Sequence, residues 1–419
     1  MTHPTEPAEA TPPRRRWFSG LRTLDPNVRT LGFVSMLADL SSEIAYPLFP
    51  IFVTIVLGAP VALLGLIEGI AEATASIAKY PFGQAADYTG RRKPFVLGGY
   101  TLGALGKLVI ALSPGWGMAL AGRTTDRLGK GMRTAPRDDL IAANTKPDQQ
   151  GLAFGLHRSM DTLGAVLGPL AAVVMLEAHV PLRWIFAVAV IPGLLSVLLI
   201  VLLVREHRET PRKQAFRLSL PRSAAFRWLL TGSLVFAVGN SSDTFILLKA
   251  KDLVGGSLIH AAVGATLLYV LYNAVYAAGS LPLGGLSDRV GQYPLVIAGY
   301  VVFALVYLGF AAAGSVAALA GLFAAYGLYI AATEGTSKAL IGRAIPTGER
   351  ASALGLYYTA TGLAAFAAST VGGLLWTAFG AWATFAYGAA AALVAAALML
   401  AGHGRVRRAL ETGEPARAA

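Results

Sequence analysis

The chain has 419 residues, of which 55% are hydrophobic and only 14% are charged. Soluble globular proteins carry about 25% charged residues, so this composition indicates a membrane protein. The formal net charge of +12 is the kind of excess that basic cytoplasmic loops produce, and we expect no nucleic-acid partner. Cysteine is absent, which excludes disulfides and thiolate metal sites.

The chain begins with a Pro-rich, polar and basic stretch, residues 1–27. We interpret it as a disordered cytoplasmic tail. The apolar segment that follows is too long for the core of a signal peptide, contains Asp39 and Glu43, and lacks a small-residue cleavage site. We therefore do not expect a signal peptide.

From residue 28 to residue 403, runs of about 20 apolar residues recur, the length needed to cross a bilayer. Backbone groups cannot stay unpaired in lipid, so each run is predicted to be a helix. The predicted transmembrane helices are 28–57, 61–82, 94–113, 116–136, 151–177, 182–204, 226–252, 260–282, 294–313, 316–340, 351–377 and 382–403. The predicted fold class is therefore an all-α integral membrane protein with twelve transmembrane helices.

The predicted loops alternate between short, nearly uncharged connections and connections rich in Arg and Lys. Both tails are also basic. By the positive-inside rule, the basic loops and both termini are cytoplasmic, in a multi-pass protein of the cytoplasmic (inner) membrane. The exceptions, Arg183, Lys249 and Lys251, lie near the predicted outer ends of helices.

The chain repeats itself. Residues 81–100 read PFGQAADYTGRRKPFVLGGY, and residues 282–300 read PLGGLSDRVGQYPLVIAGY. The repeat predicts two pseudo-symmetric six-helix bundles, and such repeats are typical of transporters that rock about a site at the membrane midplane. The predicted units are an N-terminal bundle 28–204, a basic cytoplasmic linker 205–225, a C-terminal bundle 226–403 and a cytoplasmic tail 404–419.

With these motifs in place, the chain resembles the major facilitator superfamily (MFS) over nearly its whole length. The stretch GQAADYTGRRK resembles the superfamily's signature between helices 2 and 3, and GGLSDRVG resembles its echo between helices 8 and 9. The resemblance implies that the Asp of each loop latches one conformation and does not bind substrate. Tyr88 stands where the family usually has Arg or Lys, so the first latch is expected to be weaker. The gating residues implied in these loops are Gly83, Asp87, Gly90, Arg91, Arg92, Gly284, Asp288, Arg289 and Gly291.

The fourth predicted helix carries an unusual ladder of charges. Arg123, Asp126, Arg127, Lys130 and Arg133 form one helical stripe within the membrane. A charge at the bilayer centre costs at least about 2.5–3.5 kcal/mol, so these side chains must face a wet cavity or acidic partners. The resemblance also places Arg123 at the Arg of the family's helix 4 signature, a position linked to proton handling.

Acidic residues at helical spacing on helices 1, 2 and 5 provide candidate partners for the ladder. At the matching register the second half has mostly uncharged residues, so we expect the first half to handle ions or substrate charge. The second half would offer an aromatic, hydrogen-bonding wall. The candidate proton- and substrate-binding residues are Asp39, Glu43, Tyr46, Glu68, Glu72, Arg123, Arg127, Lys130, Arg158, Asp161, Asn240, Asp243, Tyr269, Asn273, Glu334 and Lys338.

The alternative is that many of these charges are paired struts that hold helices together. We assign Asp126 to this structural role, because it is the only acid within reach of both Arg123 and Arg127.

The fifth predicted helix bears on the direction of transport. Gly155, Gly164, Gly168 and Pro169 resemble the helix 5 pattern of superfamily exporters, except that Ala171 and Ala172 replace its final glycines. The resemblance implies export and adds these four residues to the gating set. Ordinary close packing of small residues is the alternative interpretation.

We therefore expect a secondary active transporter of a small molecule, with proton-coupled efflux favoured, acting as a monomer in the lipid bilayer. An importer or uniporter of a polar or charged metabolite is the alternative. A non-transporting membrane scaffold would give no reason for intramembrane charges. No cofactor or metal is expected, and no metal-ligand spacing, nucleophile motif or phosphate loop indicates an enzyme.

Overall fold

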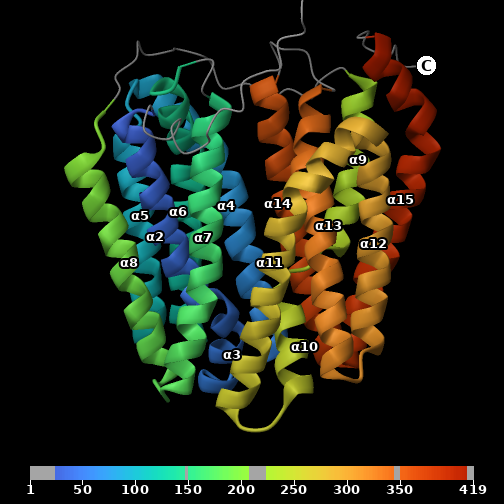
Figure 1. Cartoon of the computed structure of the whole chain (residues 1–419). Coiled ribbons are helices and arrows are strands. Elements are labelled where there is room, and N and C mark those ends of the chain that lie inside the picture. Colours follow the sequence, from blue (N-terminus) through green and yellow to red (C-terminus); the bar gives the residue numbers. More distant parts are fainter. Residues whose placement is uncertain (1–23, 147–149, 207–222, 344–349, 413–419) are drawn as a thin grey trace, which may run out of the picture.

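The computed structural model describes residues 24–146, 150–206, 223–343 and 350–412. Within these ranges the chain is helical apart from short connections. Figure 1 shows two groups of long helices that stand side by side, with the described chain ends on one side of the molecule. We call this the tail side and the opposite one the far side. The predicted tail, residues 1–27, lies almost entirely outside the described residues.

The first group contains six spans, which we call the N bundle. Its first span is α2 (Pro26–Ala45), continued by a 3₁₀ turn (Tyr46–Leu48), α3 (Phe49–Ile51) and a π-helical turn (Phe52–Val56). The other five spans are α4 (Val61–Thr89), α5 (Lys93–Leu112), α6 (Trp116–Ala143), α7 (Gln150–Glu177) and α8 (Leu182–Leu203).

The second group, the C bundle, also contains six spans. Its first span consists of α9 (Ala224–Gly239) and α10 (Thr244–Val254). The other five are α11 (Leu258–Val290), α12 (Gln292–Ala312), α13 (Val316–Arg343), α14 (Arg350–Phe379) and α15 (Ala381–Thr412). The all-helical, twelve-span architecture predicted from the sequence is thus confirmed.

Ten helices among the described residues are long and apolar enough to cross a membrane by hydropathy. The other two spans fail this criterion for different reasons. The charge ladder lowers the hydropathy of α6, and the seventh span is broken between α9 and α10. α6 nevertheless spans the N bundle, because its charged side chains have partners inside that bundle.

The prediction of one continuous helix over 226–252 was wrong. The helix stops at Gly239 and resumes at Thr244, and residues 240–243 form a non-helical link. Two Ser, an Asn and an Asp offer the backbone local hydrogen-bond partners other than the helical ones. The Ser242 N–H, for example, donates to Ser369 Oγ at 3.1 Å. In the first span, Pro47 and Pro50 lack the N–H that a regular α-helix needs, and the helix tightens and then widens there.

The cores of the two bundles differ in composition. The C bundle is packed with aromatic rings, among them Phe303, Tyr307, Phe310 and Tyr326, whose centroids lie 3.9–6.4 Å apart in contacting pairs. In the N bundle, small residues bring helices together. A Cβ on Gly106 of α5 would lie 2.5 Å from the Gly122 carbonyl oxygen of α6, so these two backbones touch.

The two bundles meet closely at the far side. There the Ala62 N–H donates to Thr377 Oγ1 at 3.1 Å, and a Cβ on Gly65 of α4 would lie only 2.2 Å from the Ser369 carbonyl oxygen of α14. Leu248 of α10 belongs to an apolar cluster formed mainly by the N bundle. Figure 1 shows α3, α10 and the start of α11 gathered at this side. The far side is therefore sealed by packing between the bundles.

We predict that Gly65→Leu prevents this far-side seal without unfolding either bundle, because the three atoms nearest to the added Cβ all belong to α14 of the opposite bundle. The chain has no cysteine, so spin labels can be attached through Val56→Cys and Phe379→Cys, two exposed far-side positions. Double electron–electron resonance should show longer label distances in Gly65→Leu. Gly117→Leu is the matched control, since a Cβ there meets open space. Unchanged distances in Gly65→Leu would contradict the seal.

Candidate functional site

The charge ladder of α6 is buried against α4 and α5. Arg123 donates from Nε to Glu68 Oε1 at 2.9 Å and from Nη2 to Glu68 Oε2 at 3.0 Å. The Glu68 side chain is 0% exposed and that of Arg123 is 7% exposed. A bidentate, charge-assisted pair of this kind is the strong form of a salt bridge, and it ties α4 to α6 at mid-depth.

Asp126 ties α6 to the opposite neighbour. Lys107 Nζ of α5 lies 2.9 Å from Asp126 Oδ1, and it also donates to the Gly103 carbonyl at 3.1 Å. Arg123 Nη1 stands 3.9 Å from the other oxygen of Asp126. Asp126 thus lies between cations of two helices, an arrangement suited to the structural role assigned to it. Lys107 was left out of the candidate set, although it is the only charged residue inside the predicted helix 94–113.

The next turn of α6 is less enclosed. Arg127 Nη1 lies 3.4 Å from Glu72 Oε1, whose side chain is 38% exposed. The guanidinium groups of Arg123 and Arg127 stand 5.1 and 5.8 Å from the ring centre of Tyr46, within cation–π range. Lys130 is exposed, and no ion pair within 4.0 Å is described for it. Arg133, in contrast, lies over the Tyr100 ring at 4.3 Å inside the N bundle.

The acids of α2 differ from those of α4. Among the described ion pairs, none within 4.0 Å involves Asp39 or Glu43. Glu43 instead accepts a hydrogen bond from Tyr269 of the C bundle, at 2.9 Å. The four acids that the sequence grouped together therefore fall into two classes: Glu68 and Glu72 are held by arginine, and Asp39 and Glu43 are not.

Several further contacts join the two bundles at mid-depth. Ser242 Oγ, in the link between α9 and α10, donates to Glu68 Oε2 at 3.2 Å. Arg158 of α7 hydrogen bonds to the Tyr276 hydroxyl and lies 3.8 Å from Glu334 Oε2. Tyr276 also donates to Glu334, at 2.6 Å. The seam between the bundles is thus polar, and it places the charged groups of Glu68 and Arg158 of the N bundle against groups of the C bundle.

The C-bundle wall of this seam is aromatic and hydroxyl-rich. Asp243 accepts hydrogen bonds from Tyr326 at 2.7 Å and from Tyr272 at 3.4 Å. The ring of Tyr269 lies 5.6 Å from that of Tyr46 across the seam. Asn273 is buried, and its side-chain amide donates to the Tyr269 carbonyl of its own helix at 3.1 Å. Asn240 ends α9, and the side chain of Lys338 lies outside the described part of the structure.

A family model described as Major Facilitator Superfamily matches residues 31–266 and 253–418. The chain belongs to the major facilitator superfamily. An uncharacterised MFS-type transporter of Methanocaldococcus jannaschii is 35% identical over 386 residues, which cover 90% of this chain and 95% of that protein. The inner membrane transport protein YajR of Escherichia coli is 25% identical over 388 residues, 87% of this chain and 80% of that protein.

Solved MFS structures share the fold. A POT family transporter in complex with a thioalcohol-conjugated peptide superimposes with a TM-score of 0.78 at 12% identity, covering 92% of this chain and 99% of that one. The nucleoside transporter NupG superimposes with a TM-score of 0.74 at 15% identity, covering 90% and 99%. This MFS protein is therefore a multi-pass membrane transporter of small molecules and not an enzyme.

The first MFS loop signature is held by a network at the tail side. Gly90 ends α4 in the left-handed conformation, with φ of 62°, which glycine adopts without strain. Arg92 Nε bonds Asp139 Oδ2 at 2.7 Å, and its Nη2 lies 3.9 Å from Asp87 Oδ1. The backbone N–H of Arg92 donates to Glu206 Oε1 at 3.0 Å. The loop is thereby tied to the end of α6 and to the chain that leaves α8.

The other gating candidates are placed in different ways. Gly83 packs on α6, since a Cβ there would lie 3.3 Å from Ala135 Cβ, and Arg91 is exposed. Gly291 has φ of 91° at the start of α12. The side chains of Asp288 and Arg289, and the surroundings of Gly284, lie outside the described part, so the second latch stays a prediction.

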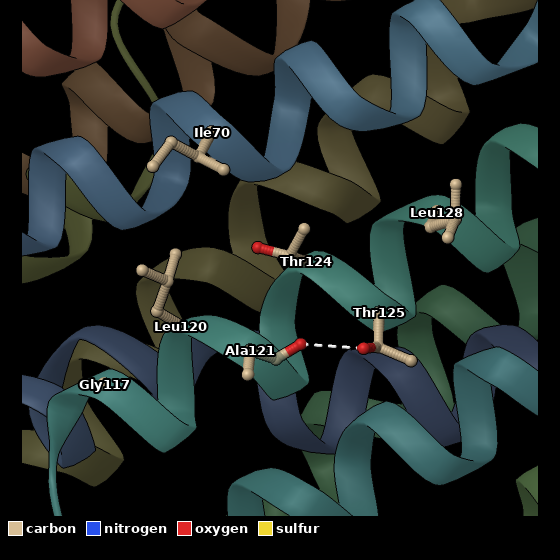
Figure 2. Close-up of a pocket in the computed structure, with 7 residues that line it drawn as sticks. All are labelled: Ile70, Gly117, Leu120, Ala121, Thr124, Thr125 and Leu128. Atoms are coloured by element: carbon tan, nitrogen blue, oxygen red, sulfur yellow. Dashed lines mark hydrogen bonds between the residues drawn. The ribbon is translucent and has the colours of Figure 1, made fainter.

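A separate groove of about 410 Å³ runs between α4 and α6. Figure 2 shows Ile70 of α4 opposite Leu120 and Thr124 of α6, with Thr125 hydrogen bonded to the Ala121 carbonyl of its own helix. The residues that line this groove are uncharged, and none belongs to the candidate set. The groove is therefore distinct from the ion network.

We predict that Arg123→Gln lowers the thermal stability of the detergent-purified transporter, because it leaves the buried Glu68 carboxylate without its cation. Breaking a buried pair costs about 3–5 kcal/mol, whereas removing both charges is often nearly neutral. The double variant Arg123→Gln/Glu68→Gln should therefore recover most of the lost Tm. Lys130→Gln on the same helix is the control and should leave Tm nearly unchanged. An Arg123→Gln protein with wild-type Tm would show that the pair contributes no stability.

We also predict that Asp87→Ala shifts the equilibrium between conformations and leaves substrate affinity within each state intact. The shift should be modest, since Asp87 is 53% exposed and exposed ion pairs contribute about 0–1 kcal/mol. Spin-label distances across the tail-side ends of the bundles would report it. Asp138→Ala, which removes a neighbouring exposed acid paired with Arg137, is the control. Identical distance distributions in Asp87→Ala and wild type would refute the latch.

Proposed function

We propose that this transporter exports a small molecule across the cytoplasmic membrane by alternating access, in exchange for protons. The observation that carries the proposal is the division among the acids of α2 and α4. Glu68 and Glu72 have arginine partners, whereas no ion pair within 4.0 Å is described for Asp39 or Glu43, and Glu43 contacts Tyr269 across the seam. A carboxyl group with no fixed cation changes its proton occupancy when its surroundings change. Rearrangement of the seam can therefore drive uptake and release of a proton.

The proposed substrate cavity lies along the seam at mid-depth. Its N-bundle wall carries Arg127 and the exposed Lys130, which supply charge, and its C-bundle wall carries Tyr269, Tyr272 and Tyr276, which supply rings and hydroxyls. Substrates would bind where both walls contribute, as expected for a fold built from two repeats. The conformation with the far side sealed would be one of the two end states of the alternating-access cycle.

In this proposal the tail side faces the cytoplasm. The tail-side connections contain Arg91, Arg92 and Lys93, and both tails are basic, which is the distribution that the positive-inside rule associates with the cytoplasm. The basic linker 205–225 would join the two bundles on the same side. The transporter is proposed to work as a monomer, with one cavity per chain.

The support for export comes from α7. Gly164 and Gly168 lie against α2, where a Cβ would meet Met36 O at 2.4 Å and Glu43 Cβ at 2.6 Å. The exporter-like pattern thus sets how closely α7 approaches α2, the helix that carries Asp39 and Glu43. Pro169 is buried in the same helix, whereas Gly155 faces open space.

The second candidate function is import or facilitated movement of a polar or charged metabolite. The charged cavity favours it, because the arginine and lysine side chains would suit a carboxylate or phosphate better than an apolar drug. The structural neighbours include peptide transporters and a nucleoside transporter.

Transport in oriented vesicles tests both functions. We expect inside-out vesicles with an acidic interior to accumulate members of a panel of labelled polar and amphipathic compounds. Asp39→Asn and Glu43→Gln should abolish gradient-driven accumulation while substrate exchange persists. Glu177→Gln, at the far-side end of α7, is the matched control.

Two outcomes would contradict the proposal. Accumulation only in right-side-out vesicles would indicate an importer. Full gradient-driven accumulation in both Asp39→Asn and Glu43→Gln would place the coupling site elsewhere or indicate a different coupling ion.

A further inference from the structure

We infer that His157 of α7 is a proton-binding site, and that a proton bound there opens a junction of four helices near the tail side. This site is separate from the acids of α2 that the proposed function uses, and His157 was not among the candidate site residues. It is formed by contacts within the N bundle alone.

Four helices of the N bundle meet at the hydroxyl group of Ser35 on α2. His157 Nε2 of α7 lies 2.7 Å from Ser35 Oγ, and the Tyr100 hydroxyl of α5 lies 3.3 Å from it. Arg137 of α6 donates from Nη1 to the same oxygen at 3.4 Å. We call these four side chains the Ser35 junction. Each of them lies about two turns from the tail-side end of its helix.

The Ser35 junction is enclosed by protein. Ser35 is 1% exposed, Tyr100 is 2% exposed and His157 is 6% exposed. In the described part of the chain, Ser35 is the only hydrogen-bond partner of the Tyr100 hydroxyl. Buried hydroxyls are normally hydrogen bonded, so Tyr100 depends on this contact.

The number of donors around Ser35 determines the form of His157. A hydroxyl has one hydrogen to donate and two lone pairs with which to accept, and arginine can only donate. When Arg137 and Tyr100 donate to the two lone pairs of Ser35, the Ser35 hydrogen is left for His157 Nε2. Nε2 is then an acceptor, which requires a neutral imidazole with its hydrogen on Nδ1. The opposite direction would leave the buried Tyr100 hydrogen without an acceptor.

A protonated His157 does not fit the same junction. Both nitrogens of an imidazolium are donors, so Arg137, Tyr100 and His157 would compete for the two lone pairs of Ser35. Either one of these contacts is lost, or Ser35 donates to Tyr100 and leaves the Tyr100 hydrogen unpaired. The bound proton also places a second positive charge beside the Arg137 guanidinium, which repels it. A proton on His157 therefore opens the junction.

The other ionisable groups around His157 come from all the helices that pack against it. They are Asp39 on α2, Tyr100 on α5, Arg133, Arg137 and Asp138 on α6, Arg158 and Asp161 on α7, and Tyr276 on α11. Asp138 is paired with Arg137 at 2.8 Å, and Asp161 with Arg158 at 3.5 Å. Two of the three acids therefore already have arginine partners when His157 is neutral, and a new ion pair with them does not offset the loss of the junction.

The Ser35 junction attaches the tail-side half of α7 to the rest of the N bundle. The far-side half is attached separately, where Gly164 and Gly168 pack on α2. Arg158, the residue after His157, contacts α11 and α13 of the C bundle. When a proton opens the junction, the tail-side half of α7 can follow these contacts across the seam. Acidification on the tail side would thus change how α7 moves with the C bundle.

The first test observes His157 in the purified full-length transporter and needs no substrate. In protein labelled with ¹⁵N-histidine, the imidazole resonances report both the tautomer and the charge. We expect the His157 signal, identified by its loss in His157→Gln, to show the neutral form with hydrogen on Nδ1 at about pH 8 and the protonated form at about pH 5. A hydrogen on Nε2 at the higher pH, or a neutral imidazole at the lower one, would overturn the inference.

Tyr100→Phe tests the donor count itself. The change removes one donor from Ser35, so the two lone pairs can accept from Arg137 and from a protonated His157. The titration midpoint of His157 should therefore move to higher pH. Tyr387→Phe is the matched control, because that phenol bonds the Val238 carbonyl in the C bundle, and it should leave the midpoint unchanged. An unchanged midpoint in Tyr100→Phe would contradict the proposed competition.

Spin labels test the consequence for α7. Phe154→Cys on α7 and Leu202→Cys at the tail-side end of α8 provide two exposed positions in a chain without cysteine. Double electron–electron resonance should show a longer and broader distance at about pH 5 than at about pH 8. His157→Gln should keep the short distance at both pH values, because its amide oxygen accepts from Ser35 and does not titrate. Ser35→Ala should show the long distance at both. Distances that do not change with pH in the otherwise wild-type protein, or the full pH response in His157→Gln, would overturn the inference.

Discussion

The rest of the structure depends on the requirement that every charge held in the low-dielectric interior have a partner. On α6 this requirement is met at mid-depth by the bidentate pair of Arg123 with Glu68 and by the contact of Asp126 with Lys107. These two interactions join α4, α6 and α5 into one unit. A buried pair is weak evidence for stability, since an apolar replacement is often as stable, but breaking one is costly. The pairs therefore fix the relative position of three helices more than they raise the overall stability.

The N and C bundles meet this requirement in different ways. The C bundle fills its interior with aromatic rings, and its Asp243 accepts hydrogen bonds from two tyrosine hydroxyls. The N bundle carries more charge and divides it. On α4 the acids are paired with arginine, whereas on α2 Glu43 accepts a hydrogen bond from the Tyr269 hydroxyl of the C bundle. The acids of the first kind are held in ion pairs with arginine, and no such ion pair within 4.0 Å is described for those of the second kind.

Much of this architecture could be predicted from the sequence. Apolar runs of membrane-spanning length, the repeated loop motif and the alternation of basic loops define twelve spans, including α6, which hydropathy alone rejects. The 3.6-residue period also places the charges of α6 on one stripe. The pairing of each arginine with a particular acid could not be predicted, because it depends on how far each helix is rotated about its axis. The break at residues 240–243 could not be predicted from the repeat either, because the matching stretch of the first half, residues 39–42, stays helical.

The strength of each contact, compared with its place in the fold, shows how such a charged protein can rearrange. The close ion pairs, Glu68 with Arg123 and Asp126 with Lys107, lie within the N bundle. The contacts across the seam are mostly hydrogen bonds from neutral hydroxyls, as with Ser242 to Glu68 and Tyr269 to Glu43. A hydrogen bond to a charged group contributes about 1.5–3 kcal/mol, and water entering the seam can replace it. Breaking a buried ion pair costs about 3–5 kcal/mol. Because the weaker contacts lie at the seam, the bundles can separate there without breaking any of the close ion pairs. The cross-seam pair of Arg158 with Glu334, at 3.8 Å, is the single described ion pair that this motion must break.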